Sequence, residues 1–136
     1  KIKGYQIIID CDVLQADGGT RTASITGGYV ALCLALKKML ENKLIKENPI
    51  RDYVAAISCG IVNGSVMIDL DYDEDSSADV DANFVIAEKS GFSEIQITGE
   101  EKTFSRESIY EMITLSQIAT TKIFEIQKNV LDQTII

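Results

Sequence analysis

The sequence predicts an α/β (α+β) sandwich in which helices cover one face of a sheet. Two observations support this prediction. Apolar residues recur at helical spacing in two segments, Ser24–Glu41 and Ser105 to about Leu131. Between these segments lie runs of β-branched residues that are separated by turn residues, which is typical of hairpins. The predicted order of elements is β-α-β-β-β-β-α, within a single domain spanning residues 1–136.

The first two elements come from the N-terminal third of the chain. Gly4–Leu14 is rich in β-branched residues, and its apolar and polar residues alternate toward its end, so a strand is expected. Gln15–Thr22 interrupts this pattern with two adjacent glycines. In Ser24–Glu41 the apolar stripe is broad, which predicts a well-buried helix.

Two hairpins are expected next. Tyr53–Val62 and Ser65–Leu70 are joined by Asn63-Gly64, and Asn-Gly favours a type I′ turn because both central residues of that turn need a positive φ. A second hairpin is predicted from Asn83–Ala87 and Phe92–Thr98, around Lys89-Ser90-Gly91. Lys46–Arg51 contains the only proline and is expected to form a loop. Ser105 is the predicted N-cap of the last helix.

Composition limits the chemistry that is possible. The 136 residues include no histidine, which excludes Ser-His-Asp and Cys-His catalysis and histidine-containing metal sites. Three widely spaced cysteines in apolar surroundings (Cys11, Cys33 and Cys59) predict buried thiols in a reducing compartment. No stretch approaches the ~20 apolar residues of a membrane span, so a cytoplasmic protein without a membrane partner is expected. The net charge of −8 argues against nucleic-acid binding over the whole surface but permits a local basic patch.

The segment Asp17-Gly18-Gly19-Thr20-Arg21-Thr22 is a candidate anion-binding loop. Paired glycines let the backbone approach a ligand, and the following helix contributes its positive N-terminal end. Thr20 can donate a hydroxyl hydrogen bond, and Arg21 can bind phosphate through a bidentate fork. The segment matches neither the P-loop nor the dinucleotide-binding glycine motif. The alternative is an ordinary turn between strand and helix, with Arg21 in solvent.

The second candidate segment is strongly acidic. Asp69–Asp81 holds seven carboxylates in thirteen residues, but the spacing does not match a calcium-binding EF-hand loop. One alternative is a solvated acidic loop. However, apolar residues interleave with the last acids, which predicts that Asp79 and Asp81 are fixed at the start of a strand. A Mg²⁺ site built from one or two carboxylates and a substrate phosphate would suit this position.

Taken together, these segments resemble the ribonuclease PH family. The resemblance begins with the run from Asp10 to Gly27, DCDVLQADGGTRTASITG. It continues through Asn48-Pro49, Ala55–Gly64 and the block Glu74-Asp75-Ser76…Asp79-x-Asp81-x-Asn83. It extends from about Ile8 to at least Thr98. An eighteen-residue run followed by a second motif at the expected distance is far more specific than a single glycine-rich loop.

This resemblance implies a phosphorolytic 3′→5′ exoribonuclease, or tRNA nucleotidyltransferase. Such enzymes remove 3′-terminal nucleotides from tRNA precursors, use inorganic phosphate as co-substrate and release nucleoside diphosphates. The implied fold resembles domain 2 of ribosomal protein S5, with helices packed on a mixed sheet. The implied assembly is a homo-oligomer, a hexameric ring formed as a trimer of dimers. RNA is the implied partner.

Site residues follow from the same resemblance. Gly19, Thr20 and Arg21 match the family's phosphate-binding positions. Asp75 and Asp81 match its catalytic carboxylates, which hold a divalent metal, with Mg²⁺ expected, or act as the acid for the leaving 3′ oxygen.

Family members are longer than this chain, which begins near the middle of their pattern. The resemblance therefore predicts that residues 1–136 are a C-terminal portion and that the missing N-terminal portion is a partner. That portion would supply a second phosphate-binding arginine and much of the RNA-binding surface, so the chain alone is expected to be inactive. One alternative is a non-catalytic RNA-binding or scaffolding subunit of an exosome-like ring. It is disfavoured because Arg21, Asp75 and Asp81 are all present. Another is an unrelated metal-dependent phosphohydrolase, which would use water instead of phosphate.

Overall fold

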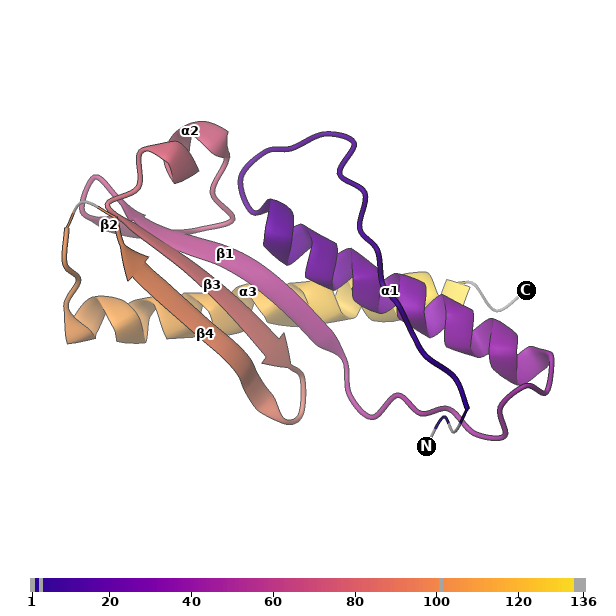
Figure 1. The fold of residues 1–136 in the computed structure, drawn as a ribbon. Coiled ribbons are helices and arrows are strands. Elements are labelled where there is room, and N and C mark those ends of the chain that lie inside the picture. Colours follow the sequence, from indigo (N-terminus) through magenta and orange to yellow (C-terminus); the bar gives the residue numbers. More distant parts are fainter. Residues whose placement is uncertain (1, 3, 101, 134–136) are drawn as a thin grey trace.

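The computed structural model describes residues 2, 4–100 and 102–133, which form a four-stranded antiparallel sheet and three helices (Figure 1). The strand order is β2-β1-β3-β4. The elements are α1 (Thr20–Glu41), β1 (Val54–Val62), β2 (Ser65–Ile68), α2 (Tyr72–Ser76), β3 (Val80–Ala87), β4 (Gly91–Gly99) and α3 (Arg106–Gln133).

The main hydrophobic core lies between one face of the sheet and α3. Alternate residues of β1 and β3 point to this face because successive side chains of a strand point to opposite sides. Phe84 at its centre is fully buried, and its ring lies 6.3 Å from that of Phe92 in an edge-on arrangement. The buried cluster consists of Ala55, Ile57, Cys59, Ala82, Phe84, Ile86, Met112, Ala119 and Phe124. The opposite face combines a smaller buried apolar cluster, Val62, Leu70 and Ala78, with polar residues such as Ser58 and Asp81.

The predicted hairpins and the last helix are confirmed. In the β1–β2 turn, Asn63 and Gly64 have φ values of 51° and 79°, as a type I′ turn requires. β3 and β4 pair antiparallel around the predicted turn, although β3 begins at Val80, earlier than expected. The N-cap of α3 is Ser105, whose hydroxyl oxygen accepts the backbone N–H of Ser108 at 3.0 Å.

Helix α1 lies along the edge of β1 that β2 leaves open. β2 pairs only with the last four residues of β1, so the earlier backbone groups on that edge need other partners. The hydroxyl of Thr26 accepts the N–H of Ala56 at 3.0 Å and donates to its carbonyl at 3.2 Å. The side-chain amide of Gln127 donates to the carbonyl of Val54 at 3.0 Å. By length and composition α1 could span a membrane. Here the Thr26 hydroxyl joins it to the sheet edge, and the Gln127 amide also donates to the Thr26 carbonyl at 3.3 Å.

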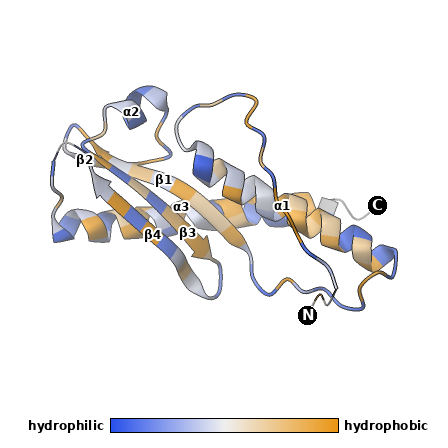
Figure 2. Cartoon of the chain, viewed as in Figure 1, coloured by the Kyte–Doolittle hydropathy of each residue, from blue (hydrophilic) through white to orange (hydrophobic). Residues whose placement is uncertain are grey.

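The predicted first strand is wrong. Gly4–Leu14 is extended but belongs to no sheet, and it crosses over α1 (Figure 1). A β-branched composition only suits a pleated surface, and no described strand offers this segment a backbone ladder. Its apolar side chains are exposed, including Leu14 at 96%, and Figure 2 shows hydrophobic positions along this segment. The sheet is consequently antiparallel throughout, not mixed.

The same segment changes two related expectations. Because it crosses α1 as an isolated chain, most apolar residues of that helix are only partly buried, although Tyr29 and Leu36 are buried as predicted. The three cysteines are free thiols, but only Cys59 is buried, whereas Cys11 is exposed.

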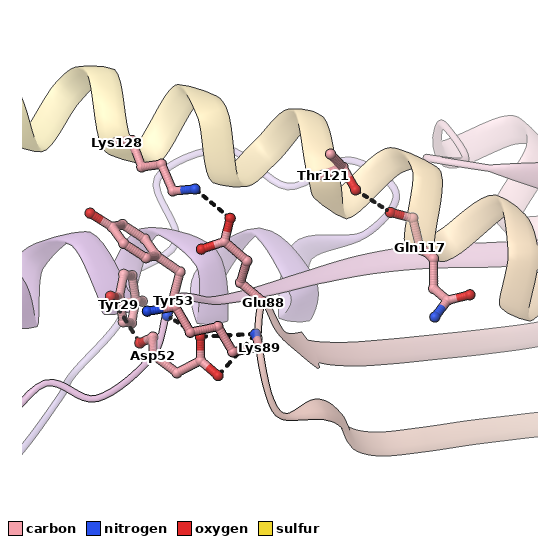
Figure 3. Close-up of polar contacts among 8 residues, drawn as sticks. All are labelled: Tyr29, Asp52, Tyr53, Glu88, Lys89, Gln117, Thr121 and Lys128. Carbon is pink, nitrogen blue, oxygen red and sulfur yellow. Dashed lines mark hydrogen bonds and ion pairs between the residues drawn. The ribbon is translucent and has the colours of Figure 1, made fainter.

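Asp52 fixes the β3–β4 turn to the start of β1 (Figure 3). Its carboxylate accepts the N–H of Lys89 at 3.1 Å, the N–H of Ser90 at 2.9 Å and the hydroxyl of Ser90 at 2.8 Å. The N–H of Tyr53 donates to it as well, at 2.9 Å. Desolvation alone would raise the pKa of Asp52, but the hydrogen bonds from Ser90, Lys89 and Tyr53 outweigh it, so the pKa lies below its usual range.

The Asp52→Asn variant is expected to unfold at a lower urea concentration than the wild type at neutral pH. A carboxylate with a depressed folded-state pKa stabilises the fold above its unfolded pKa of about 3.9, and that stability is lost as the pH falls through the folded pKa. The difference in urea midpoint should therefore shrink as the pH is lowered below about 4. Asp12→Asn, at an exposed position, is the control. A difference that stays constant over the whole pH range would contradict a role for the charge.

Candidate active site

The glycine-rich loop forms the N-terminus of α1. The helix begins at Thr20, four residues earlier than predicted, so Thr20 and Arg21 lie in its first turn. Gly19 is the N-cap and has a φ of 69°, in the left-handed region that favours glycine. Gly19 makes no side-chain capping hydrogen bond, and the first turn contains no acidic residue. The first-turn N–H groups and the helix dipole therefore make a positive site suited to an anion.

Asp17 joins this loop to the acidic segment. One oxygen of its carboxylate accepts the N–H of Gly18 at 2.8 Å and the N–H of Tyr72, the first residue of α2, at 2.7 Å. The hydroxyl of Thr20 donates to the carbonyl of Asp17 at 2.8 Å. The Thr20 hydrogen bond that was expected to reach a ligand is thus directed into the loop in this structure.

Both glycines of the loop are in close contact with the chain behind them. A Cβ on Gly18 would lie 2.0 Å from the carbonyl oxygen of Leu70, and one on Gly19 would lie 2.9 Å from the hydroxyl of Ser58. Ser58 is 3% exposed, and its hydroxyl has no hydrogen-bond partner in the described part of the chain. The loop therefore packs directly on β1 and on the residues that lead into the acidic segment.

The acidic segment is not a loose loop. It contains the short helix α2, which the sequence analysis did not predict. The carboxylate of Asp71 accepts the N–H of Glu74 at 2.9 Å, and the carboxylate of Glu74 accepts the N–H of Asp71 at 3.0 Å. This reciprocal arrangement is a capping box. Asp71 and Glu74 thus stabilise the helix that holds the next acid, Asp75.

Asp75 and Asp81 line one cavity of about 730 Å³, together with Glu100. Asp75 lies in α2 and Asp81 in β3, and both are half-buried, whereas Asp73 is exposed. Burial raises the pKa of Asp81, and the negative charges of Asp75 and Glu100 raise it further. The structure therefore brings together the two carboxylates that the resemblance singled out.

Asp79 is fixed next to β3, as expected, but its environment differs from that of Asp75 and Asp81. Its carboxylate pairs with Lys102 at 3.0 Å, and its N–H donates to the carbonyl of Ile61 at 2.8 Å.

The donor set around the cavity is compatible with a magnesium ion. In the described part of the chain, no group of three or more His, Cys, Asp or Glu residues is placed to bind a metal. Mg²⁺, however, is commonly bound by one or two carboxylates that act with substrate phosphates. Asp75 and Asp81 would hold the ion in that way, and a nearby cation would offset the repulsion between their charges.

Arg21 is exposed, but it is not free in solvent, because it forms an ion pair. Its two terminal guanidinium nitrogens bind the two carboxylate oxygens of Glu94 on β4, both at 2.9 Å. Glu94 lies opposite Val85 on β3. Asp81 lies four residues earlier on β3 and shares this polar face of the sheet, at roughly 13 Å along the strand by the usual rise per residue. The Arg21–Glu94 pair and Asp81 therefore lie on the same face of the sheet, separated along β3.

Three residues at this site were not predicted from the sequence: Ser58, Glu94 and Glu100. Asp17 belongs to the predicted loop, but its hydrogen bond to α2 was not expected. A signal for Glu94 did exist, because it alternates with Gln96 and Thr98 as the polar face of a predicted strand. No local pattern marks Ser58, because its role depends on contact with a distant loop.

The chain was compared with known families and proteins. Residues 52–119, which are half of the chain, match the family described as "3' exoribonuclease family, domain 2". The chain is 53% identical over 123 residues to the ribonuclease PH of Methylocella silvestris, and the match covers 90% of this chain and 52% of that protein. This chain belongs to the ribonuclease PH family of 3′ exoribonucleases.

Two solved structures confirm the expected fold of a ribonuclease PH family member. The crystal structure of rice (Oryza sativa) Rrp46 matches with a TM-score of 0.70 and 21% identity, over 88% of this chain and 51% of that chain. The Archaeoglobus fulgidus exosome with RNA bound to the active site matches with a TM-score of 0.62 and 19% identity, over 82% of this chain and 44% of that chain. At these identities the similarity concerns the fold alone. The chain spans about half the length of the curated relative that it matches.

Gly19→Ala is expected to destabilise the fold by about 1–2 kcal/mol, because alanine disfavours a left-handed conformation and its Cβ would press on Ser58. Gly27 is a matched control in the same helix, since a Cβ there meets no atom within 4 Å. Gly27→Ala should instead stabilise the helix by about 0.5–1 kcal/mol. Urea unfolding of both variants tests this contrast, and equal effects would show that the loop conformation imposes no special demand.

Proposed function

We propose that this chain is the part of a phosphate-dependent 3′→5′ exoribonuclease, a tRNA nucleotidyltransferase, that contains the phosphate loop and the catalytic carboxylates. The main support is the close packing of the α1 N-terminus against the segment that positions Asp75. Asp17 bonds directly to both parts, across 55 residues of sequence. An anion site next to paired carboxylates is what an enzyme needs if it brings phosphate to a phosphodiester.

The reaction is an exchange at the terminal phosphorus of RNA. An oxygen of inorganic phosphate attacks that phosphorus, the bond to the 3′ oxygen of the preceding nucleotide breaks, and a nucleoside diphosphate is released. The attacking dianion must be held beside a polyanion. The N–H groups at Gly19 and Thr20 and the guanidinium of Arg21 supply the required positive potential.

The leaving 3′ oxygen must gain a proton or have its charge neutralised. Asp81 is suited to donate a proton, because burial and neighbouring carboxylates favour its protonated form. A Mg²⁺ ion bound by Asp75 and Asp81 would stabilise the charge that develops on the phosphate and the leaving oxygen. Either role requires the half-buried position that these two residues share.

The remaining half of the protein is the proposed partner of the apolar surface formed by Gly4–Leu14 and α1. Exposed apolar side chains that gather on one surface mark an interaction site. Those of this surface that are more than 45% exposed are Tyr5, Ile7, Ile8, Ile9, Val13 and Leu14. That half would add a second cationic group to the phosphate site. We further propose that the whole protein is cytoplasmic, acts on the 3′ ends of tRNA precursors and forms a hexameric ring as a trimer of dimers.

Arg21 provides the first test, in the full-length protein. Arg21→Ala should raise the KM for phosphate at least tenfold. The loss of a charge-assisted hydrogen bond costs about 1.4 kcal/mol or more of binding free energy, and 1.4 kcal/mol corresponds to a factor of ten. Arg21→Lys should be nearly as damaging, because an ammonium group cannot form a bidentate fork. The measurement is release of nucleoside diphosphate from a tRNA with a 3′ extension, over a range of phosphate concentrations. If Arg21→Ala leaves the phosphate dependence unchanged, the loop does not bind the nucleophile.

The carboxylates provide the second test. Asp75→Asn and Asp81→Asn should each lower kcat by about 100-fold or more, the range expected for loss of an acid or metal ligand. Asp73→Asn is the matched control, because Asp73 is exposed in the same short helix. Circular dichroism should show that all three variants remain folded. Normal RNA binding without phosphorolysis in the wild type would instead support a non-catalytic subunit of an exosome-like ring.

A further inference from the structure

The pairing of Arg21 with Glu94 is the most specific side-chain contact on the polar face of the sheet. The two residues are 73 positions apart in the sequence, and both terminal nitrogens of the guanidinium are used. The contact raises the pKa of Arg21 and lowers the pKa of Glu94, so both groups stay charged. The two side chains are 51% and 39% exposed. An ion pair this exposed adds little to the stability of the fold. Its main effect is therefore on the orientation of the Arg21 guanidinium.

The geometry leaves Arg21 able to bind an anion. A guanidinium has five N–H donors in a fixed plane, and the bidentate pair with Glu94 uses two of them. Of the three others, Nε–H and the outer N–H of Nη2 point to the same side of the group, where one phosphate can accept both. Glu94 itself is held by the antiparallel ladder of β3 and β4, opposite Val85. It therefore anchors its carboxylate to the sheet, beside a register shift between Val85 and Ile86, and the bidentate pair limits the rotamers of the long Arg21 side chain.

Two effects of Glu94 on phosphate binding oppose each other. Its negative charge weakens the attraction of the site for a dianion, but water screens that repulsion because the pair is exposed. Its orientation of the guanidinium fork is not screened by water or salt. We propose, on the basis of the proposed function, that Glu94 is the positioning residue for Arg21 and that it strengthens binding of inorganic phosphate.

The test uses the full-length protein and the isosteric variant Glu94→Gln. The KM for phosphate should rise by about threefold to fivefold, with kcat nearly unchanged, as expected when ground-state positioning is lost at an exposed pair. Glu107→Gln is the charge-matched control, since Glu107 is an exposed acid on α3. The thermal midpoint of each variant is measured as well, because a merely structural role would lower the midpoint without a selective change in the KM for phosphate.

A double-mutant cycle shows whether Glu94 acts through Arg21. In the Arg21→Ala background, adding Glu94→Gln should leave kcat/KM for phosphate unchanged, since no guanidinium remains to be oriented. An effect as large as in the wild-type background would overturn the proposal. So would an unchanged or lower KM for phosphate in the single variant, and a lower value would mean that Glu94 competes with phosphate.

Calorimetric titration with inorganic phosphate separates this inference from the proposed function. If the wild type binds phosphate but releases no nucleoside diphosphate, the proposed function is wrong. The positioning role of Glu94 is then tested by the Kd for phosphate alone, which should be higher in Glu94→Gln than in the wild type. If phosphorolysis is normal and the Glu94→Gln variant matches the wild type, only the positioning role fails. If the wild type binds no phosphate, both are wrong.

Discussion

The close approach of a glycine-rich loop to the backbone at Leu70 is the constraint on which the rest of the site depends. Gly18 has no room for a side chain there, and the carboxylate of Asp17 bonds to both sides of the contact. This contact places the N-terminus of α1 next to α2. Because α2 holds Asp75, the same contact sets the anion-binding end of one helix beside the carboxylate cavity. A larger residue at position 18 would separate the two halves of the proposed chemistry.

The sheet divides the molecule into a supporting side and a reactive side. On one face, Phe84 and its neighbours pack against α3, and this burial holds β3 in register. On the other face, the same strand presents Asp81, which is one residue from the fully buried Val80. Because successive side chains of a strand point to opposite faces, the core packing on one face also holds the backbone that carries Asp81 on the other. A site placed on such a strand is held more precisely than one on a free loop.

The sequence predicted those elements whose causes are local. Asn63-Gly64 and Ser105 determine a turn and a cap through their own backbone and side-chain preferences, and both are found in the structure. The prediction of a strand at Gly4–Leu14 was wrong because a strand needs a neighbouring strand to pair with, and β propensity alone does not provide one. The helix α2 was missed because seven acids obscured its capping box. The pairing of Arg21 with Glu94 joins residues 73 positions apart, so no local pattern could predict it.

The distribution of charge in this acidic chain is compatible with the proposed reaction between anions. Two of its cations near the site are already paired, Arg21 with Glu94 and Lys102 with Asp79. An anion can still use the N-terminal end of α1 together with the N–H groups of Arg21 that Glu94 does not occupy. The potential of the helix end comes from the backbone and does not depend on the net charge of −8. A backbone site is positive without a mobile side chain, so it needs little reorganisation when the charge on phosphate is redistributed during attack. In the proposed reaction, the carboxylates of Asp75 and Asp81 are then left for the leaving oxygen, where a proton or a metal is needed.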